Sequence, residues 1–311
     1  MISLFQYYRI VAAFLIVMIH QQFWQPCTFV CGLESAAVPI FACMAGYLYK
    51  GDLAKKVQRV ALPYVIWAVI YFVANNVVLD LFIRHESFEF PGLRSWLLGG
   101  TACHLWFLPC LFVAFAATEG LMRLMSVRCL RLSDCVKHQT ANIVLIVLAM
   151  ATQFLPGETS ASLPGYCRIY FGRLLLFFAL GGLIRIQPYP LTCTSHAITL
   201  SMGAILLVFG LANLSIHFIP GLSFQPLLLV VGLMLLAIGF GEFKLPKFIG
   251  DLASATMGIY LVHALFTSAA NVALAKLGHA SLPVFIALPI IGVLFFGCYL
   301  VVRFMPKWMK G

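Results

Sequence analysis

Charged side chains are scarce in this sequence. Only 10% of its 311 residues are Asp, Glu, Lys or Arg, whereas 62% are hydrophobic, and the mean hydropathy is +1.00. A soluble chain of this length would carry about a quarter charged residues. No long polar stretch separates the apolar runs either. The composition excludes an ordinary soluble enzyme and predicts a single polytopic membrane domain over residues 1–311, with no separate soluble domain.

Several signatures of soluble function are also absent. The sequence has no C-x-x-C pair, no P-loop and no dinucleotide-binding fingerprint, and its ten cysteines show no metal-ligand spacing. A basic patch interleaved with aromatic residues, which nucleic-acid binding needs, is missing. We therefore expect neither a metal nor a nucleic-acid partner. Cys27 and Cys31 follow the first apolar run, and the sequence leaves open whether they form a disulfide.

Ten apolar runs dominate what is present. A helix needs about 20 predominantly apolar residues to cross the hydrocarbon core. The runs are Leu4–Phe23, Leu33–Tyr49, Val60–Leu79, His104–Leu121, Thr140–Leu155, Ile169–Ile186, Ala197–Leu214, Leu222–Phe240, Leu252–Ala275 and Leu282–Phe304. The first is not followed by a small-x-small cleavage site, so we expect it to remain as a membrane helix. The pattern predicts an all-α bundle of about ten transmembrane helices.

The few cations orient this bundle. If both termini are cytoplasmic, fourteen Lys and Arg residues fall on the inner side and only four fall on the outer side. The inner cations are Lys50, Lys55, Lys56, Arg59, Arg123, Arg128, Arg131, Lys137, Arg185, Lys244, Lys247, Arg303, Lys307 and Lys310, and the outer ones are Arg84, Arg94, Arg168 and Lys276. The net charge of +10 is therefore mainly a topology signal. We expect a multi-pass protein with both termini in the cytoplasm.

Arg9 and His20 lie within the first apolar run. Eleven residues are about three helical turns, so the two side chains share one helix face, roughly 16 Å apart along the axis. Burying Arg at bilayer depth costs at least ~2.5 kcal/mol, which favours a polar cavity with a partner. The alternative is that Arg9 snorkels to the cytoplasmic interface and His20 simply lies at the far end of the span.

A basic pair precedes the third run. Lys56 and Arg59 are three residues apart, so they share one face if a helix begins there. Paired cations at a cytoplasmic helix start suit the phosphates of a nucleotide-like ligand. Ordinary positive-inside retention explains the same residues.

Three further segments stand out. They are V-P-I-F-A-C-M-A-G-Y over residues 38–47, H-L-W-F-L-P over residues 104–109, and G-I-Y-L-V-H over residues 258–263. Each admits a packing explanation, with Gly46 allowing close helix approach, Trp106 anchoring the interface and His263 as a satisfied interior histidine.

Together these residues resemble the acyltransferase 3 family of integral-membrane acyltransferases. The resemblance rests on Arg-x10-His in the first run, V-P-x-F…G-Y, the basic pair followed by P-Y, L-W-F-L-P, and I-Y-L-x-H, in that order. Two positions depart from the family pattern. Ala45 stands where Ser is frequent, and Lys56 takes the first place of a pair that is often Arg-x-x-Arg, which gives a point charge instead of a planar fork.

The resemblance implies transfer of an acyl group, usually acetyl, from cytoplasmic acetyl-CoA to a hydroxyl of a surface polysaccharide or a lipid-linked glycan precursor. It also implies a bacterial-type cytoplasmic (inner) membrane location. His20 is then the candidate general base, or the group that accepts the acyl group itself. Arg9 would stabilise the donor or the oxyanion, and Lys56 with Arg59 would bind the donor.

A polar, aromatic-rimmed mouth is expected on the acceptor side. Its candidate residues lie near the outer ends of the second, fourth and sixth runs, and a saccharide would stack on Trp there. They are Glu34, His104, Trp106, Arg168 and Arg173. The alternative function is a transporter or flippase of a small molecule or lipid-linked sugar, since intramembrane Arg and His are equally expected in one. Against it, no internal repeat is found.

Overall fold

The computed structural model describes residues 2–23, 28–74, 92, 96, 103–127, 133–156, 163–185, 193–212, 217–219, 222–279 and 281–306. Cys27 lies outside the described residues, and with it the question of a disulfide to Cys31. Six of the cations used to orient the chain also lie outside them. These are Arg84, Arg94, Arg128, Arg131, Lys307 and Lys310.

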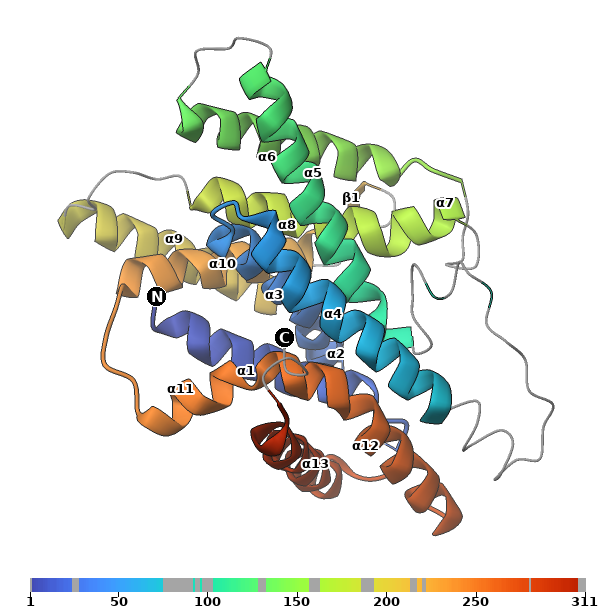
Figure 1. Ribbon diagram of the computed structural model, residues 1–311. Helices are drawn as coiled ribbons and strands as arrows, with labels where there is room; N and C mark the ends of the chain where they lie inside the picture. The colour runs from blue at the N-terminus through green and yellow to red at the C-terminus, as the bar shows by residue number, and fades with distance from the viewer. Residues whose placement is uncertain are drawn as a thin grey trace.

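Helices make up nearly all of the described chain (Figure 1). The first half contains α1 (Leu4–Ile19), α2 (Thr28–Ser35), α3 (Ala37–Leu48), α4 (Leu53–Phe72), the 3-10 turn η3 (Cys103–Trp106), α5 (Phe107–Val127) and α6 (Asp134–Thr152). The second half contains α7 (Leu163–Tyr166), the π-helical segment η4 (Cys167–Gly172), α8 (Arg173–Ile184), α9 (Cys193–Leu211), α10 (Phe224–Phe240), α11 (Lys247–Ser254), α12 (Thr256–Lys276) and α13 (Val284–Phe304).

Each of the ten predicted apolar runs overlaps a helix. Six stretches are long and apolar enough to cross a membrane: Val30–Leu48, His104–Val127, Asp134–Thr152, Cys167–Ile184, Thr256–Lys276 and Val284–Phe304. Three apolar helices are shorter, and α4 begins with a cationic turn. The prediction of a helical membrane bundle is therefore confirmed in its main feature, whereas the count of ten spans and the orientation of the termini stay predictions.

Two details differ from the sequence prediction. The first run was expected to be helical to Phe23, but α1 ends at Ile19, and the Phe23 carbonyl accepts a hydrogen bond from Leu282 N at 2.6 Å. The second difference is a short antiparallel pair, β1 (His217–Ile219) and β2 (Leu222–Ser223), where an all-α fold was expected. The run expected to begin at Leu222 therefore becomes helical only at Phe224.

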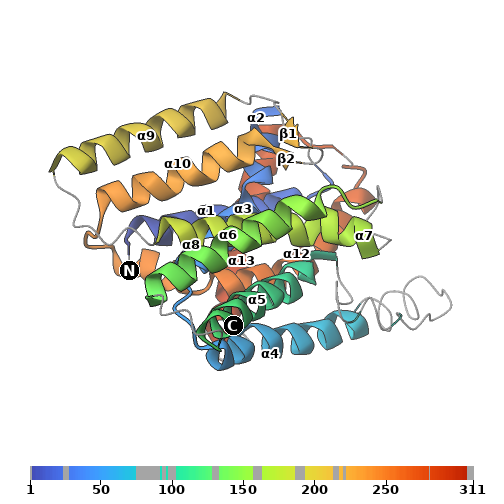
Figure 2. The ribbon, with the colours of Figure 1, turned by 90° about the horizontal axis from the view of Figure 1, so that it is seen from above.

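The helices pack in layers around α1 (Figure 2). Helices α9 and α10 form one edge of the bundle, α4 and α5 form the opposite edge, and α1, α3, α6 and α8 lie between them. Within this arrangement α1 contacts both α3 and α12. Residues that α1 carries are therefore presented to two neighbouring helices at once.

Glycines set the close approach of α3 and α8. A Cβ added to Gly46 would come within 1.8 Å of the Phe178 carbonyl oxygen, and one added to Gly181 would come equally close to the Cys43 carbonyl. Small residues at such contacts let helix backbones approach in a membrane, where van der Waals packing drives association. The packing role expected for Gly46 is confirmed.

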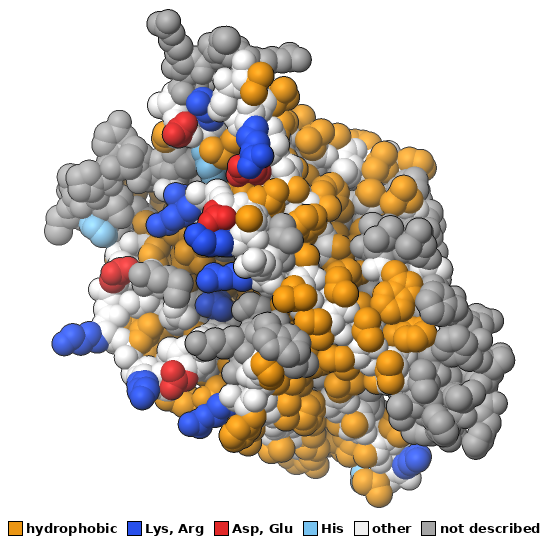
Figure 3. All heavy atoms as spheres, in the orientation of Figure 1, with side chains coloured by type: hydrophobic (Ala, Val, Ile, Leu, Met, Phe, Trp, Pro, Cys, Tyr) orange, Lys and Arg blue, Asp and Glu red, His pale blue; other side chains and the backbone are white. Residues whose placement is uncertain are grey.

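Segments that are distant in the sequence meet at one end of the bundle. At this end, Ser3 Oγ donates to the Phe243 carbonyl at 2.7 Å, and Arg185 donates to the Tyr49 carbonyl. All four belong to segments that the charge pattern assigns to the inner side. Most Lys and Arg side chains visible in Figure 3 gather on the left of the view, and hydrophobic side chains cover much of the rest. The contacts thus bring predicted inner segments together.

Candidate active site

A left-handed turn positions the cations at the start of α4. Gly51 and Asp52 have φ of 86° and 67°, and the Asp52 carboxylate caps the helix by accepting from Lys55 N at 3.2 Å. The Lys55 ammonium lies 2.7 Å from the same carboxylate. These contacts with Lys55 hold the pKa of Asp52 below its usual value. Lys55 is thereby paired, and the next cations, Lys56 and Arg59, are carried onto the adjacent face of the helix.

Arg9, Lys56 and Arg59 line one cavity of about 210 Å³. The remaining walls are mainly apolar and come from α3, α4, α5 and α12, and they include Ala45 and Phe115. The sequence predicted a donor site from Lys56 and Arg59, and it predicted that Arg9 stabilises the donor or the oxyanion. The structure brings all three cations to the same space.

The cations of the cavity repel one another, and Asp52 compensates Lys56 only at a distance. Among the described residues, no carboxylate lies within ion-pair distance of Arg9, Lys56 or Arg59. Lys56 instead places its ammonium 5.5 Å from the Phe115 ring centroid. Lys56 precedes the apolar part of α4, and its burial, with the nearby Arg59 charge, lowers its pKa. An anion in this cavity would relieve the repulsion between the cations.

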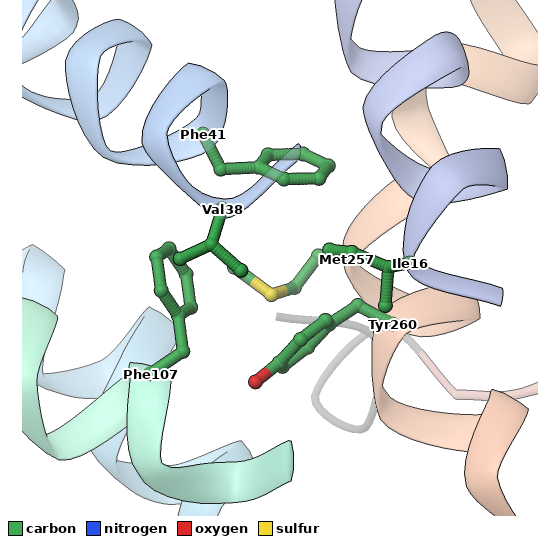
Figure 4. Close-up of a pocket in the computed structure, with 6 residues that line it drawn as sticks. All are labelled: Ile16, Val38, Phe41, Phe107, Met257 and Tyr260. Atoms are coloured by element: carbon green, nitrogen blue, oxygen red, sulfur yellow. The ribbon is translucent and has the colours of Figure 1, made fainter. Parts of the chain in front are cut away.

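A narrow apolar slot adjoins the cationic cavity (Figure 4). Phe41, Phe107 and Met257 line both spaces, and Ile16, Val38 and Tyr260 complete the slot. In Figure 4 these side chains converge from four helices on one space, and apart from the Met257 sulfur and the Tyr260 hydroxyl their side chains present only carbon. The open volume is about 10 Å³, close to that of a single water.

Three histidines meet beyond Tyr260. The ring centroid of His263 lies 5.0 Å from that of His20 and 4.9 Å from that of His104, and the His20 and His104 centroids are 6.2 Å apart. His104 is 3% exposed, His263 is fully buried and His20 is half-buried. The Tyr260 ring contacts both buried imidazoles, with centroids 5.8 Å from each. The slot thus ends at residues that touch the histidine cluster.

Backbone hydrogen bonds hold the cluster together. The Tyr260 hydroxyl donates to the His104 carbonyl, and the Tyr71 hydroxyl donates to the Leu261 carbonyl at 2.7 Å. Both ring nitrogens of His104 and Nε2 of His263 are buried without a hydrogen-bond partner among the described residues. Buried polar atoms are nearly always paired in folded proteins, so these nitrogens are candidates for contact with a polar ligand.

His20 lies at the end of α1 instead of inside the helix. Its φ and ψ of −91° and 5° identify it as the C-cap of α1. The Asn271 amide donates to the His20 carbonyl at 3.1 Å, and its oxygen accepts from Gln22 N at 3.0 Å. Arg9 and Ile16 line the two spaces, and His20 follows one turn beyond Ile16. Helix α1 and its C-cap thus connect Arg9 at the cationic cavity with His20 at the histidine cluster.

The other acceptor candidates are less closely assembled. Trp106 stacks on Tyr170 of η4 with ring centroids 4.5 Å apart, and the Arg168 carbonyl accepts from Gln153 at 3.1 Å. Arg173 is exposed. Of the five predicted mouth residues, only His104 joins the histidine cluster through a contact among the described residues.

Glu34 also stays apart from the cluster. It is half-buried in α2, and its Oε1 atom is buried without a hydrogen-bond partner within the described part of the chain. Nothing in the described contacts connects it to His20. Its assignment to the acceptor mouth rests on its predicted depth alone.

Sequence reasoning missed the part that α12 plays. His263 was interpreted as a satisfied interior histidine, and Asn271 was not singled out. The only signal for His263 was its place three residues after Tyr260 in the I-Y-L-x-H segment. Within the described residues, no group of His, Cys, Asp and Glu is arranged to hold a metal ion, and the three imidazoles form no such group.

Comparison with known families gives the class of this site. The acyltransferase 3 family model, an acyltransferase domain, matches residues 4–303. The chain belongs to the acyltransferase 3 family. No curated protein and no solved structure was matched in the corresponding searches. The matched range contains Arg9, the three clustered histidines and the basic pair, so this acyltransferase is a membrane protein whose cationic cavity and histidine cluster both fall within the family domain.

Proposed function

We propose that this acyltransferase moves an acetyl group from cytoplasmic acetyl-CoA to a hydroxyl of a surface polysaccharide or a lipid-linked glycan precursor. The observation that carries the proposal is one continuous set of residues. Arg9, Lys56 and Arg59 line the cationic cavity, Phe41, Phe107 and Met257 are shared with the apolar slot, and Tyr260 leads from the slot to the histidines. A donor with a phosphorylated end and a thin thioester arm has the same order of polarity, and the slot side chains would have to move apart to admit the arm.

The donor's phosphates would occupy the cationic cavity. Arg59 is exposed and Lys56 is half-buried, so both are open to a ligand arriving from the predicted cytoplasmic side. Arg forms bidentate contacts with phosphate, whereas Lys acts as a point charge. Arg9, which is further along the path, would contact the inner phosphate or the thioester region.

His20 would act on the acceptor hydroxyl. Its ring nitrogen takes the hydroxyl proton as the oxygen attacks the thioester carbonyl, a new C–O bond forms, and the C–S bond breaks. The proton then passes to the departing coenzyme A thiolate, which leaves as the thiol. In a second route, His20 first accepts the acetyl group and then transfers it to the hydroxyl.

The acceptor would approach from the end of the bundle opposite the cationic cavity. At that end His104 contacts His20, and Trp106, two residues after His104 in the chain, stacks on Tyr170. A sugar ring can pack its apolar face on Trp while its hydroxyls reach polar groups such as Glu34, Arg168 and Arg173. We place the protein in a bacterial-type inner membrane, among lipids that carry or neighbour the glycan.

A transporter or flippase also requires polar residues at membrane depth. The family match favours the enzyme, because it identifies the domain as an acyltransferase. Transfer and transport predict different covalent products. Only transfer leaves a new ester.

The test is to express the chain in a host with its surface glycans and compare them by mass spectrometry with those of a host that carries the His20→Ala variant. We expect an added acetyl group only with the wild-type chain. Purified protein in lipid nanodiscs with isotope-labelled acetyl-CoA should place the label in the glycan ester. If label never leaves acetyl-CoA while the glycan is moved across the membrane, the transporter reading replaces this proposal.

A further inference from the structure

The hydrogen-bonding state of His263 is determined by its own helix. Its Nδ1 atom lies 2.6 Å from the Tyr260 carbonyl oxygen, one turn earlier in α12. A carbonyl can only accept a hydrogen bond, so Nδ1 carries the hydrogen. In the neutral imidazole, Nε2 is then left with a lone pair and no hydrogen.

That lone pair is buried beside His20. His263 is 0% exposed, and its Nε2 has no hydrogen-bond partner among the described residues. The His20 ring is 5.0 Å away, centroid to centroid. Two imidazoles joined by an N–H···N hydrogen bond at ordinary length have centroids about 5 Å apart. A modest ring rotation is therefore enough to pair them, and pairing removes the free-energy cost of an unsatisfied buried acceptor.

The same face of α12 holds the His20 backbone. Asn271 lies eight residues after His263, which is close to two helical turns, so the two side chains share one helix face. Its amide binds the His20 carbonyl, and its oxygen binds Gln22 N. Both hydrogen bonds act just where α1 ends and the chain would otherwise be free to change direction. Helix α12 thus contacts His20 through the ring and through the main chain.

We propose that His263 and Asn271 are positioning residues for acyl transfer: His263 Nε2 accepts the N–H of His20, and Asn271 fixes the His20 main chain. The remaining nitrogen of His20 then keeps its lone pair directed at the acceptor hydroxyl. This inference rests on the proposed role of His20. When His20 takes the hydroxyl proton, both of its nitrogens carry hydrogen, and His263 continues to accept one of them until the other proton passes to the coenzyme A thiolate.

Three substitutions separate this role from packing. His263→Gln keeps an acceptor near the Nε2 position, His263→Asn keeps a donor near the Nδ1 position for the Tyr260 carbonyl, and His263→Leu keeps neither. We expect kcat to fall about 100-fold in the Asn and Leu variants, because a misaligned base loses that much, and to be largely retained in the Gln variant. The KM for acetyl-CoA should stay unchanged in all three. If the Asn variant performs as well as the Gln variant, His263 serves only its own helix and the proposal is wrong.

Asn271 has a matched control on the same helix face. Asn271→Leu removes both hydrogen bonds to the end of α1, whereas Thr267→Val changes a buried side chain whose hydroxyl donates only to the Ala264 carbonyl of its own helix. We expect a kcat loss of about 10-fold or more for Asn271→Leu and less than about 2-fold for Thr267→Val. Equal losses in both variants would show a packing effect and overturn the positioning role of Asn271.

A measurement without turnover separates this inference from the proposed function. Solid-state NMR of protein labelled with ¹⁵N-histidine in lipid reports the tautomer of each ring, with the His20 signals identified by their loss in His20→Asn. We expect one neutral tautomer for His20 in the wild type and a mixture in His263→Leu. Unchanged His20 signals would overturn the inference even if acetyl transfer is confirmed. A change confined to His104, the other ring near His263, would overturn it as well.

Discussion

The cationic cavity and the histidine cluster lie at the two ends of the path, and they accommodate polar side chains within a membrane protein in different ways. The cationic cavity gathers Arg9, Lys56 and Arg59 in an open space, where cations without a carboxylate at ion-pair distance among the described residues are available to a ligand. The histidine cluster buries imidazole rings, and nitrogens of His104 and His263 have no hydrogen-bond partner among the described residues. Charge suits binding of a charged donor from water, whereas burial strengthens hydrogen bonds at the reacting atoms. We therefore propose that the cationic cavity supplies affinity for the donor and that the histidine cluster supplies the chemistry.

The largest effect should come from the chemical end. His20→Ala is expected to lower acetyl transfer at least ~100-fold, because removal of a general base usually has that effect. Insertion and expression should stay near normal, since His20 is the half-buried cap of α1. The measurement is turnover of purified protein in nanodiscs with saturating acetyl-CoA.

His196→Ala is the matched control for His20→Ala. His196 lies in α9, where its Nδ1 is 3.1 Å from the Gly239 carbonyl, and it takes no part in the cluster. It should retain wild-type turnover. If His20→Ala retains more than about a tenth of wild-type turnover, the general-base assignment is wrong.

The cationic end should change affinity instead of rate. Removing both charges with Lys56→Ala and Arg59→Ala is expected to raise the KM for acetyl-CoA by about 10-fold or more, because two charge-assisted contacts to phosphate are lost. The kcat and the acceptor KM should remain close to wild type. Steady-state kinetics with each substrate varied in turn provides the measurement.

Lys55→Ala with Arg123→Ala is the control pair. These cations are exposed and paired with Asp52 and Glu119. They should leave the donor KM unchanged. A shift in acceptor affinity in the cavity variant would remove Lys56 and Arg59 from the donor path, and a topology reporter excludes inversion as the cause.

Arg9 tests whether the cavity needs geometry as well as charge. Arg9→Lys keeps the charge but loses the planar fork, so we expect a several-fold fall in kcat/KM for acetyl-CoA. Arg9→Ala should be worse than Arg9→Lys. Wild-type kinetics for Arg9→Lys would instead favour snorkelling of Arg9 to the interface.

The smallest effect is expected at the acceptor mouth. Trp106→Ala and Arg173→Ala should each weaken use of the acceptor by a few-fold, since a stacking surface or one exposed charge contributes little alone. Donor binding, measured by calorimetry, should be intact. Wild-type rates for both variants across acceptor concentrations would place acceptor entry elsewhere, and entry beside Arg9 would then be tested next.

Much of the fold followed from local composition. Runs of apolar residues predict membrane helices because the bilayer leaves unpaired backbone groups no water to bind. The spacing of Arg9 and His20 predicted a shared helix face because eleven residues are about three helical turns. The end of α1 at Ile19 was missed because the chain beyond it contacts the distant Leu282. The β1–β2 pair was missed because local backbone pairing forms it and hydrophobicity does not.

The sequence by itself determined the class of protein and the helical architecture, and it predicted a site at Arg9 and His20, since these depend on hydrophobicity, periodicity and motif order along the chain. Only the tertiary structure decided which residues share a site. It joined Arg9 to Lys56 and Arg59 across about 50 residues of chain, and it placed His263 and Asn271 of α12 against His20. Such neighbours arise from helix packing, in which small residues such as Gly46 and Gly181 set how closely backbones approach, and no local pattern encodes that geometry.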